Sequence, residues 1–150
     1  MNPKEHPARI ASQRSMSCSE RRSKEEWLSL FADDAIVEDP VGPSPLDQEG
    51  KGHRGKEAIS TFFDRNIAPS GRKFEIKDSF ACGQEVANVG TIHLFLADGR
   101  EGRCDGVFVY KVNEEGKIVS LRAFWEWNRM LATIFKPASI CPPTERRKGA

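Results

Sequence analysis

The stretch from Leu30 to Gly42, LFADDAIVEDPVG, separates a helical pattern from a loop and a series of strand patterns. Its second half alternates like a short strand, so Val37 and Asp39 share one side. If Val37 faces the core, Asp39 is carried inward beside it. A carboxylate in an apolar pocket resists ionisation, so its pKa rises towards the range of a general base. Because Pro40 follows directly, an ordinary strand-end turn remains the alternative interpretation of Asp39.

The hydrophobic pattern changes along the chain from helical spacing to strand-like alternation. Helices are expected first, and a run of strands with the hairpin signal Asp98-Gly99 follows. This order indicates an α+β fold rather than repeated βαβ units. The predicted helices cover residues 7–18, a segment from 24 to about 31, and 56–67; the predicted strands cover 73–81, 85–97, 101–112 and 117–128.

Length and composition limit the classes of protein to consider. The 150 residues fit one domain, expected over residues 1–136, with a solvated tail over 137–150. The 23 basic and 22 acidic side chains nearly balance, so a nucleic acid is not expected as a partner. No signal-peptide-like or membrane-spanning run occurs, which indicates a cytoplasmic protein without a membrane partner. The four cysteines and three histidines are scattered, so neither a metal site nor a cofactor is expected.

The stretch around Asp39 closely resembles the segment that carries the catalytic base in bacterial Δ5-3-ketosteroid isomerases. The likeness continues through residues 55–63 and 116–123 and covers most of residues 10–128. These enzymes belong to the superfamily of nuclear transport factor 2 (NTF2) and the SnoaL-like cyclases, and uncharacterised mycobacterial proteins of the isomerase-like type resemble the chain most closely. The resemblance implies a cone-shaped NTF2-like fold, in which a curved antiparallel sheet wraps over three N-terminal helices, with Asp39 as the base.

The same resemblance places doubt on isomerase activity. The isomerases stabilise their enolate with a tyrosine and a protonated aspartate, but Ser15 and Phe108 occupy these positions here. Losing one such donor commonly lowers the rate by about a hundredfold to a thousandfold. His93, at an apolar pocket position of the isomerases, and Tyr110 are candidate replacements. A structural role for His93 and simple packing for Tyr110 are the alternatives.

The last predicted strand has the clearest alternation, with two tryptophans two residues apart at its end. Such a row can form the wall of a site for a flat ligand, or it can be ordinary core. The candidate ligand-contacting residues are Ser15, Val37, Phe63, Phe95, Phe108, Tyr110, Leu121, Ala123, Trp125 and Trp127.

Three kinds of function remain open from the sequence. The first is a steroid Δ-isomerase-like enzyme acting on a steroid-like or polyketide-like ketone, with Asp39 as the base. The second is a non-catalytic binding protein for a flat hydrophobic small molecule, and the third is an interaction module. A homodimer is expected, because the strand with Ile92 and Leu94 on one side carries Val89 and Phe95 on the other, and one cone covers only one of these faces.

Overall fold

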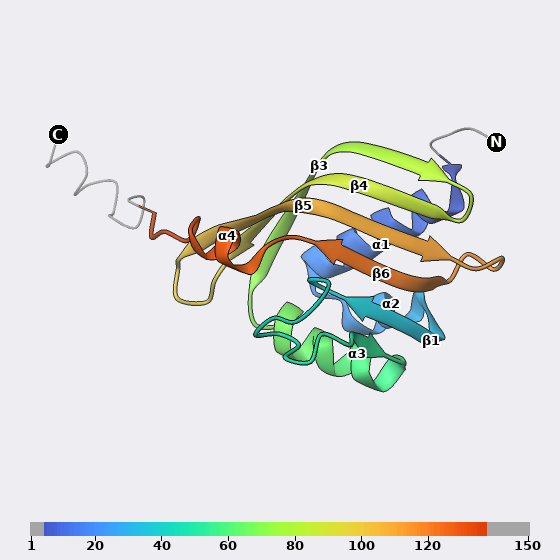
Figure 1. The fold of residues 1–150 in the computed structure, drawn as a ribbon, viewed down its shortest axis with the longest axis horizontal. Helices are drawn as coiled ribbons and strands as arrows, with labels where there is room; N and C mark the ends of the chain where they lie inside the picture. The colour runs from blue at the N-terminus through green and yellow to red at the C-terminus, as the bar shows by residue number, and fades with distance from the viewer. Residues whose placement is uncertain (1–4, 138–150) are drawn as a thin grey trace, which may run out of the picture.

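The computed structural model describes residues 5–137, in which helices and the strands β1 and β2 precede a run of longer strands (Figure 1). The elements are α1 (Pro7–Arg21), α2 (Lys24–Ser29), β1 (Phe31–Glu38), β2 (His53–Arg54), α3 (Lys56–Phe62), the π-helical turn η2 (Phe63–Ile67), β3 (Gly71–Cys82), β4 (Glu85–Phe95), β5 (Glu101–Val112), β6 (Ile118–Phe124) and α4 (Trp127–Leu131). The α+β class is confirmed. The predicted tail lies almost wholly outside the described residues.

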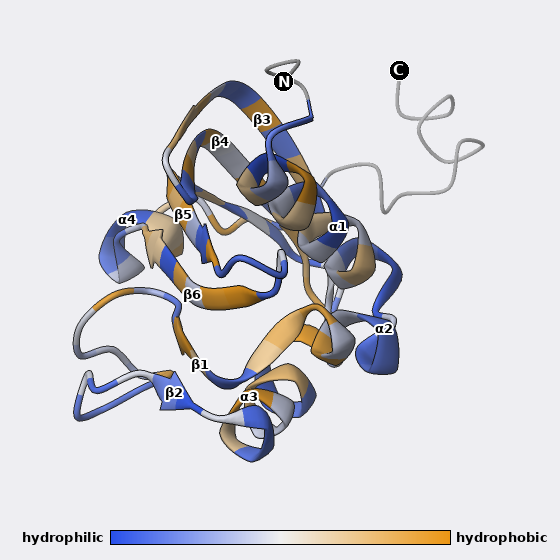
Figure 2. Cartoon of the chain, turned by 90° about the vertical axis from the view of Figure 1, so that its right-hand side faces the viewer, coloured by the Kyte–Doolittle hydropathy of each residue, from blue (hydrophilic) through white to orange (hydrophobic). Residues whose placement is uncertain are grey.

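One six-stranded sheet, in the order β2-β1-β6-β5-β4-β3, forms the body of the fold. All neighbouring strands are antiparallel except β1 and β6, which run parallel. Figure 2 shows the sheet bending around α1 and leaving its two edges apart, with α3 next to β1. The predicted cone-shaped NTF2-like arrangement of a curved sheet over N-terminal helices is therefore confirmed.

Small side chains allow α1 to lie close against the concave face of the sheet. Its buried residues include Ala8, Ala11, Ser12 and Ser15. Asn88 on β4 donates a hydrogen bond from Nδ2 to Ser12 Oγ at 3.1 Å, so both buried polar groups are satisfied. This close approach fixes one wall of the interior.

The end of the chain differs most from the expected elements. The predicted strand over 117–128 ends at Phe124, and Trp127 begins the short helix α4. The predicted helix over 56–67 ends as a π-helical turn. The alternation of apolar residues in the sequence continues through Trp127, and a five-residue helix is too short to show a helical period of its own.

No helix within residues 5–137 combines the length and the apolar character needed to cross a bilayer.

Gly106 on β5 allows the end of β6 to approach closely. A Cβ atom at this position would lie 2.1 Å from the carbonyl oxygen of Phe124 and 3.2 Å from Cβ of Trp125. We therefore expect Gly106→Ala to lower the free energy of unfolding by about 1–3 kcal/mol through overpacking, measured by urea denaturation.

Gly71→Ala is the matched control, because its added Cβ would meet no atom nearer than 3.5 Å. It should change stability by no more than about 0.5 kcal/mol. Equal losses in the two variants would show that the backbone approach at Gly106 is not a constraint on the fold.

Candidate functional site

A cavity of about 450 Å³ lies between the concave face of the sheet, helix α1, the π-helical turn and α4. This volume falls within the range of about 300–1,000 Å³ that is usual for small-molecule sites. Buried Trp27 and Tyr110 line one part of the wall, while the exposed side chain of Leu131 lines another. Most of the wall is apolar, and its charged residues are Asp39, Arg65 and Arg72.

Asp39 directly follows β1 and is held at the cavity by the neighbouring strand β6. The next-but-one residue, Val41, donates its backbone N–H to the carbonyl of Ala123 at 2.9 Å. The side chain accepts a hydrogen bond from Trp125, with 2.6 Å between Nε1 and Oδ1. Val37 is fully buried, so the expectation that it faces the core and carries Asp39 inward is confirmed.

The environment of Asp39 favours its neutral form. Burial raises the pKa of the carboxyl group, and this effect exceeds the opposing influence of the Trp125 hydrogen bond and of the charges of Arg72 and His53. A carboxylate whose pKa is raised is better matched to accepting a proton near neutral pH than an ordinary surface aspartate.

A buried chain of hydrogen bonds forms the inner wall. Trp27 donates from Nε1 to Ser15 Oγ at 3.1 Å, and Ser15 Oγ lies 3.1 Å from the hydroxyl of Tyr110. Burial raises the pKa of Tyr110, and the nearby negative charge of Asp39 acts in the same direction. The phenol therefore stays protonated. When Ser15 donates to Tyr110, the phenolic proton can be donated to a ligand in the cavity.

Arg72 lies at the start of β3 and also lines the cavity. Its Nη2 donates to the carbonyls of Ile67 and Ser70, at 2.5 and 2.9 Å. Its Nε is buried without a hydrogen-bond partner among the described residues. Burial lowers the pKa of this guanidinium, and the charge of Asp39 partly offsets that effect. The sequence analysis missed Arg72, although it alternates with Phe74 and Ile76 on the inward side of its strand.

The structure brings most of the predicted ligand-contacting side chains to one cavity. Those that line it are Ser15, Asp39, Phe108, Tyr110, Leu121, Ala123, Trp125 and Trp127. The rings of Trp125 and Trp127 lie 6.0 Å apart. Val37 and Phe63 are buried in the core instead of lining the wall, and Phe62 lines it beside Phe63.

The predicted cavity positions of His93 and Phe95 are wrong. The inward-facing side chains of β4 include those of Val86, Asn88, Ile92 and Leu94, so the alternate row faces outward. His93 is 40% exposed and its Nε2 lies 2.9 Å from Glu75 Oε1 on the outer face. Phe95 is 43% exposed. Both rows of this strand are partly apolar, so alternation alone did not identify the inward row.

No group of three side chains among residues 5–137 is arranged to hold a metal ion. The described cysteines Cys18, Cys82 and Cys104 are free thiols. Cys104 lines the cavity, but burial raises its pKa to about 12. A thiol in this state is a poor nucleophile.

The fold is an α+β cone with a mostly apolar cavity, and Asp39 is the acidic residue in the wall of that cavity. Residues 13–121 match the SnoaL-like domain, and the chain belongs to this family.

Solved structures with the same fold include several at 32–35% identity. RV0760c from Mycobacterium tuberculosis is 35% identical, with a TM-score of 0.79 over 87% of this chain and 96% of that one. It has also been solved in complex with estradiol-17beta-hemisuccinate. The Δ5-3-ketosteroid isomerase from Mycobacterium sp. is 32% identical, with a TM-score of 0.78 over 87% and 98% of the two chains. A computationally designed binder of 17-OHP is 34% identical, with a TM-score of 0.80 over 87% and 98%.

The raised pKa of Asp39 predicts a pH-dependent gain in stability for Asp39→Asn. The folded pKa lies above the unfolded value of about 3.9, so wild-type stability falls as the pH rises through the folded pKa. Each pKa unit of this difference corresponds to about 1.4 kcal/mol. Asparagine keeps an acceptor for Trp125, so the variant should be the more stable at pH 7, and its advantage should disappear below about pH 4.

Asp105→Asn serves as the control, because its stability at pH 7 should change in the opposite direction. Its carboxylate accepts a hydrogen bond from Thr91 at 2.7 Å, and this bond holds the pKa below its usual value. That variant should lose stability at pH 7. Urea denaturation of both variants across this pH range makes the comparison, and a destabilised Asp39→Asn at pH 7 would mark Asp39 as a structural turn residue.

Proposed function

We propose that the protein is a steroid Δ-isomerase-like enzyme that binds a steroid-like or polyketide-like apolar ketone, with Asp39 as the general base. The observation that carries this proposal is the Asp39 carboxyl group itself. It lies on the wall of an apolar cavity, accepts a hydrogen bond from Trp125, and has a pKa raised by burial.

The proposed reaction moves one proton and one double bond. The Asp39 carboxylate takes a proton from the carbon between the carbonyl and an isolated C=C bond. The electron pair of that C–H bond moves towards the carbonyl oxygen, giving a dienolate. The Asp39 carboxylic acid then returns the proton to the far end of the diene, which leaves the double bond conjugated with the carbonyl and the base regenerated.

The dienolate oxygen needs a hydrogen-bond donor, and we assign this role to Tyr110. Phe108 lines the cavity at the position of the isomerases' aspartate and has no proton to donate. The phenol of Tyr110 remains protonated and is oriented by Ser15. A neutral buried donor of this kind stabilises developing negative charge without reorganisation.

The choice of a steroid-like ligand is supported by the relatives. A 32% identical protein is a Δ5-3-ketosteroid isomerase, and a 35% identical one has been solved with a steroid ester.

A non-catalytic binding protein for a flat hydrophobic molecule is the second candidate. The observation that favours it is Phe108, which removes one of the two donors that the isomerases use.

Binding and turnover can be separated with one variant. A flat phenolic steroid should change the tryptophan emission, because Trp27, Trp125 and Trp127 all line the cavity. Wild-type protein should convert a Δ5-3-ketosteroid to the conjugated ketone, followed by ultraviolet absorbance. Asp39→Asn should bind as well as wild type and lose at least about a hundredfold in rate, because the amide cannot accept the proton.

Tyr110→Phe should also keep binding and lose about a hundredfold in rate. Binding without any turnover by wild type would favour the second candidate. Unchanged emission at saturating steroid would count against the cavity as a steroid site, and turnover that survives in Asp39→Asn would rule out Asp39 as the base.

We also propose that two copies associate through the outer face of the sheet. Val89, Val107 and Phe124 lie in register across β4, β5 and β6 on this face. Val89 is 37% exposed and Phe124 is 42% exposed. An apolar row of this kind is more stable when a second surface covers it.

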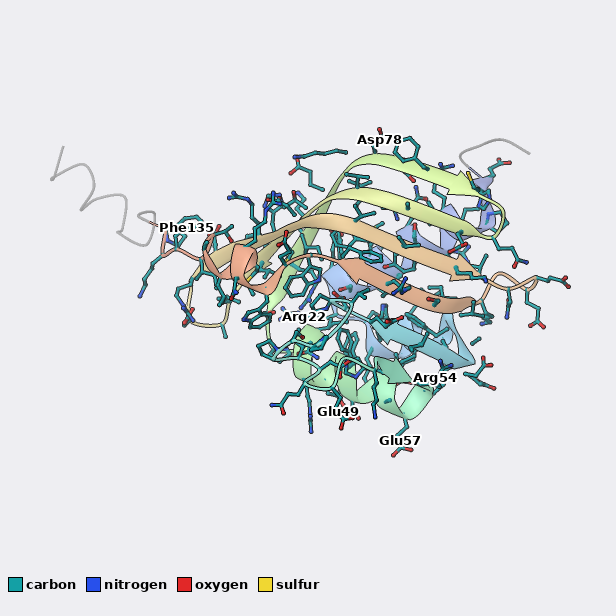
Figure 3. The ribbon with its side chains drawn as sticks, viewed as in Figure 1. Arg22, Glu49, Arg54, Glu57, Asp78 and Phe135 are labelled. Carbon is teal, nitrogen blue, oxygen red and sulfur yellow. The ribbon has the colours of Figure 1, made fainter. Side chains whose placement is uncertain are left out.

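Sedimentation at micromolar concentration should therefore give the mass of a dimer. Val89→Lys should shift the protein towards the monomer, because it places a charge in the covered row, whereas Glu57→Lys on exposed α3 should not. In Figure 3 the Glu57 side chain projects outward below α3, away from the sheet. A monomeric wild-type protein would overturn this proposal.

A further inference from the structure

Neutral polar side chains line a region of the cavity that the hydrogen bonds around Asp39 and Tyr110 do not reach. They belong to Ser19 on α1, Asn66 in the π-helical turn η2, and Ser70 just before β3. We call these three residues the second polar group. Most of the remaining wall is apolar, and a few polar groups in such a wall usually fix how a ligand is oriented.

The second polar group lies where the end of α1, the turn η2 and the start of β3 meet. Arg22, which caps the end of α1, donates to the carbonyl of Ala68 at 3.4 Å. Arg72 on β3 donates to the carbonyls of Ile67 and Ser70, at 2.5 and 2.9 Å. These hydrogen bonds hold the turn against both neighbouring elements.

The hydroxyl of Tyr110 lies farther back along both α1 and the sheet. It is 3.1 Å from Ser15 Oγ. Ser19 lies one turn beyond Ser15 on the same face of α1, and Arg22 lies about 10 Å beyond Ser15 along the helix. Tyr110 pairs with Val86 near the beginning of β4, whereas the start of β3 pairs with the last residues of that strand. An elongated ligand whose ketone accepts from Tyr110 can therefore extend to the second polar group.

The second polar group keeps unused hydrogen-bonding capacity. The side chains of Ser19 and Asn66 have no hydrogen-bond partner among residues 5–137. Ser19 is only 5% exposed, yet its hydroxyl keeps accessible surface, unlike the Nε of Arg72. Ser70 Oγ accepts from Arg72 Nη2 at 3.3 Å, which leaves its own proton for another acceptor. A ligand that displaces water from the cavity and places only apolar atoms here leaves these groups unpaired, which is unfavourable.

The chemistry of the second polar group fits a neutral oxygen atom. Hydroxyl and amide side chains both donate and accept hydrogen bonds, so they can bind the oxygen of an alcohol or of a ketone. Arg65 also lines the cavity, but its side chain is exposed, and a charge in contact with water contributes little to binding. An uncharged oxygen function is therefore the better match than an anion.

We propose that the natural ligand carries a second oxygen, in an alcohol or ketone group remote from its reacting ketone, and that Asn66 and Ser19 bind this oxygen. The inference rests on the proposed function and narrows its ligand class from apolar ketones to ketones with a second neutral oxygen function. A site that hydrogen-bonds a ligand oxygen rejects the analogue that lacks it, because its own polar groups are then left without partners.

The test compares two steroids that already have the conjugated 3-ketone, so that the protein consumes neither. One carries a 17-keto group, and the other has a methylene group at that position. Wild-type protein should bind the diketone about tenfold more tightly, because the analogue leaves polar groups of the wall unpaired. If burial of apolar surface alone decided affinity, the analogue would bind more tightly instead. Tryptophan emission reports both affinities.

Asn66→Leu keeps a similar side-chain size and removes the amide. It should abolish most of the preference for the diketone and bind the analogue at least as tightly as wild type does. Ser19→Ala should lower the preference to a smaller extent. Asn128→Leu is the matched control, because Asn128 on α4 is exposed and lies outside the cavity wall, so it should keep the full preference.

Equal affinity of wild type for the two steroids would overturn the inference, and so would a preference that both Asn66→Leu and Ser19→Ala retain in full. The wild-type comparison needs no variant, and Ser19→Ala removes only one hydroxyl, so the test stands even if Asn66→Leu does not fold. If wild type binds both steroids equally and isomerises a Δ5-3-ketosteroid in an Asp39-dependent way, only this inference fails. If neither steroid binds, this inference and the proposed function fail together.

Discussion

The hydrogen bond from Trp125 to Asp39 joins two residues that are 86 positions apart, and the arrangement of the site depends on it. The bond is possible because β1 and β6 run parallel, which brings the ends of both strands to the same edge of the sheet. Gly106 contributes by leaving room for the backbone of β6. A carboxyl group carried here by β1 is held beside an indole N–H in the wall of a mostly apolar cavity.

Asp39 and Arg72 both line the cavity, but their side chains do not form an ion pair. Burial raises the pKa of Asp39 and lowers that of Arg72, and the charge of each opposes the shift of the other. Direct contact would hold Asp39 ionised and make it a weaker proton acceptor. Without that contact, burial prevails and the pKa of Asp39 stays above its ordinary value.

Much of the fold and the position of Asp39 could be predicted from the sequence. The predicted strand pattern that leads to Asp39 has a buried side, and Val37 lies on it. The strands β3 to β5 were also predicted within about two residues, because hairpin turns mark their ends. His93 could not be placed, because both sides of β4 carry apolar residues and register depends on neighbouring strands. Arg72 was missed because a charged residue at a strand start ordinarily faces solvent, although it shares its side of β3 with Phe74 and Ile76.

The parallel pairing of β1 with β6 also affects how the protein folds. Hairpins such as β3–β4 and β4–β5 form from residues that are close in sequence. In contrast, β1 pairs with β6, which begins about eighty residues after β1 ends. Closing so long a loop is slow and entropically costly. On the ribosome, Asp39 emerges early but can meet Trp125 only when most of the chain has been made. The candidate site is therefore completed late in synthesis. A partly synthesised chain can form much of the sheet before Asp39 and Trp125 meet.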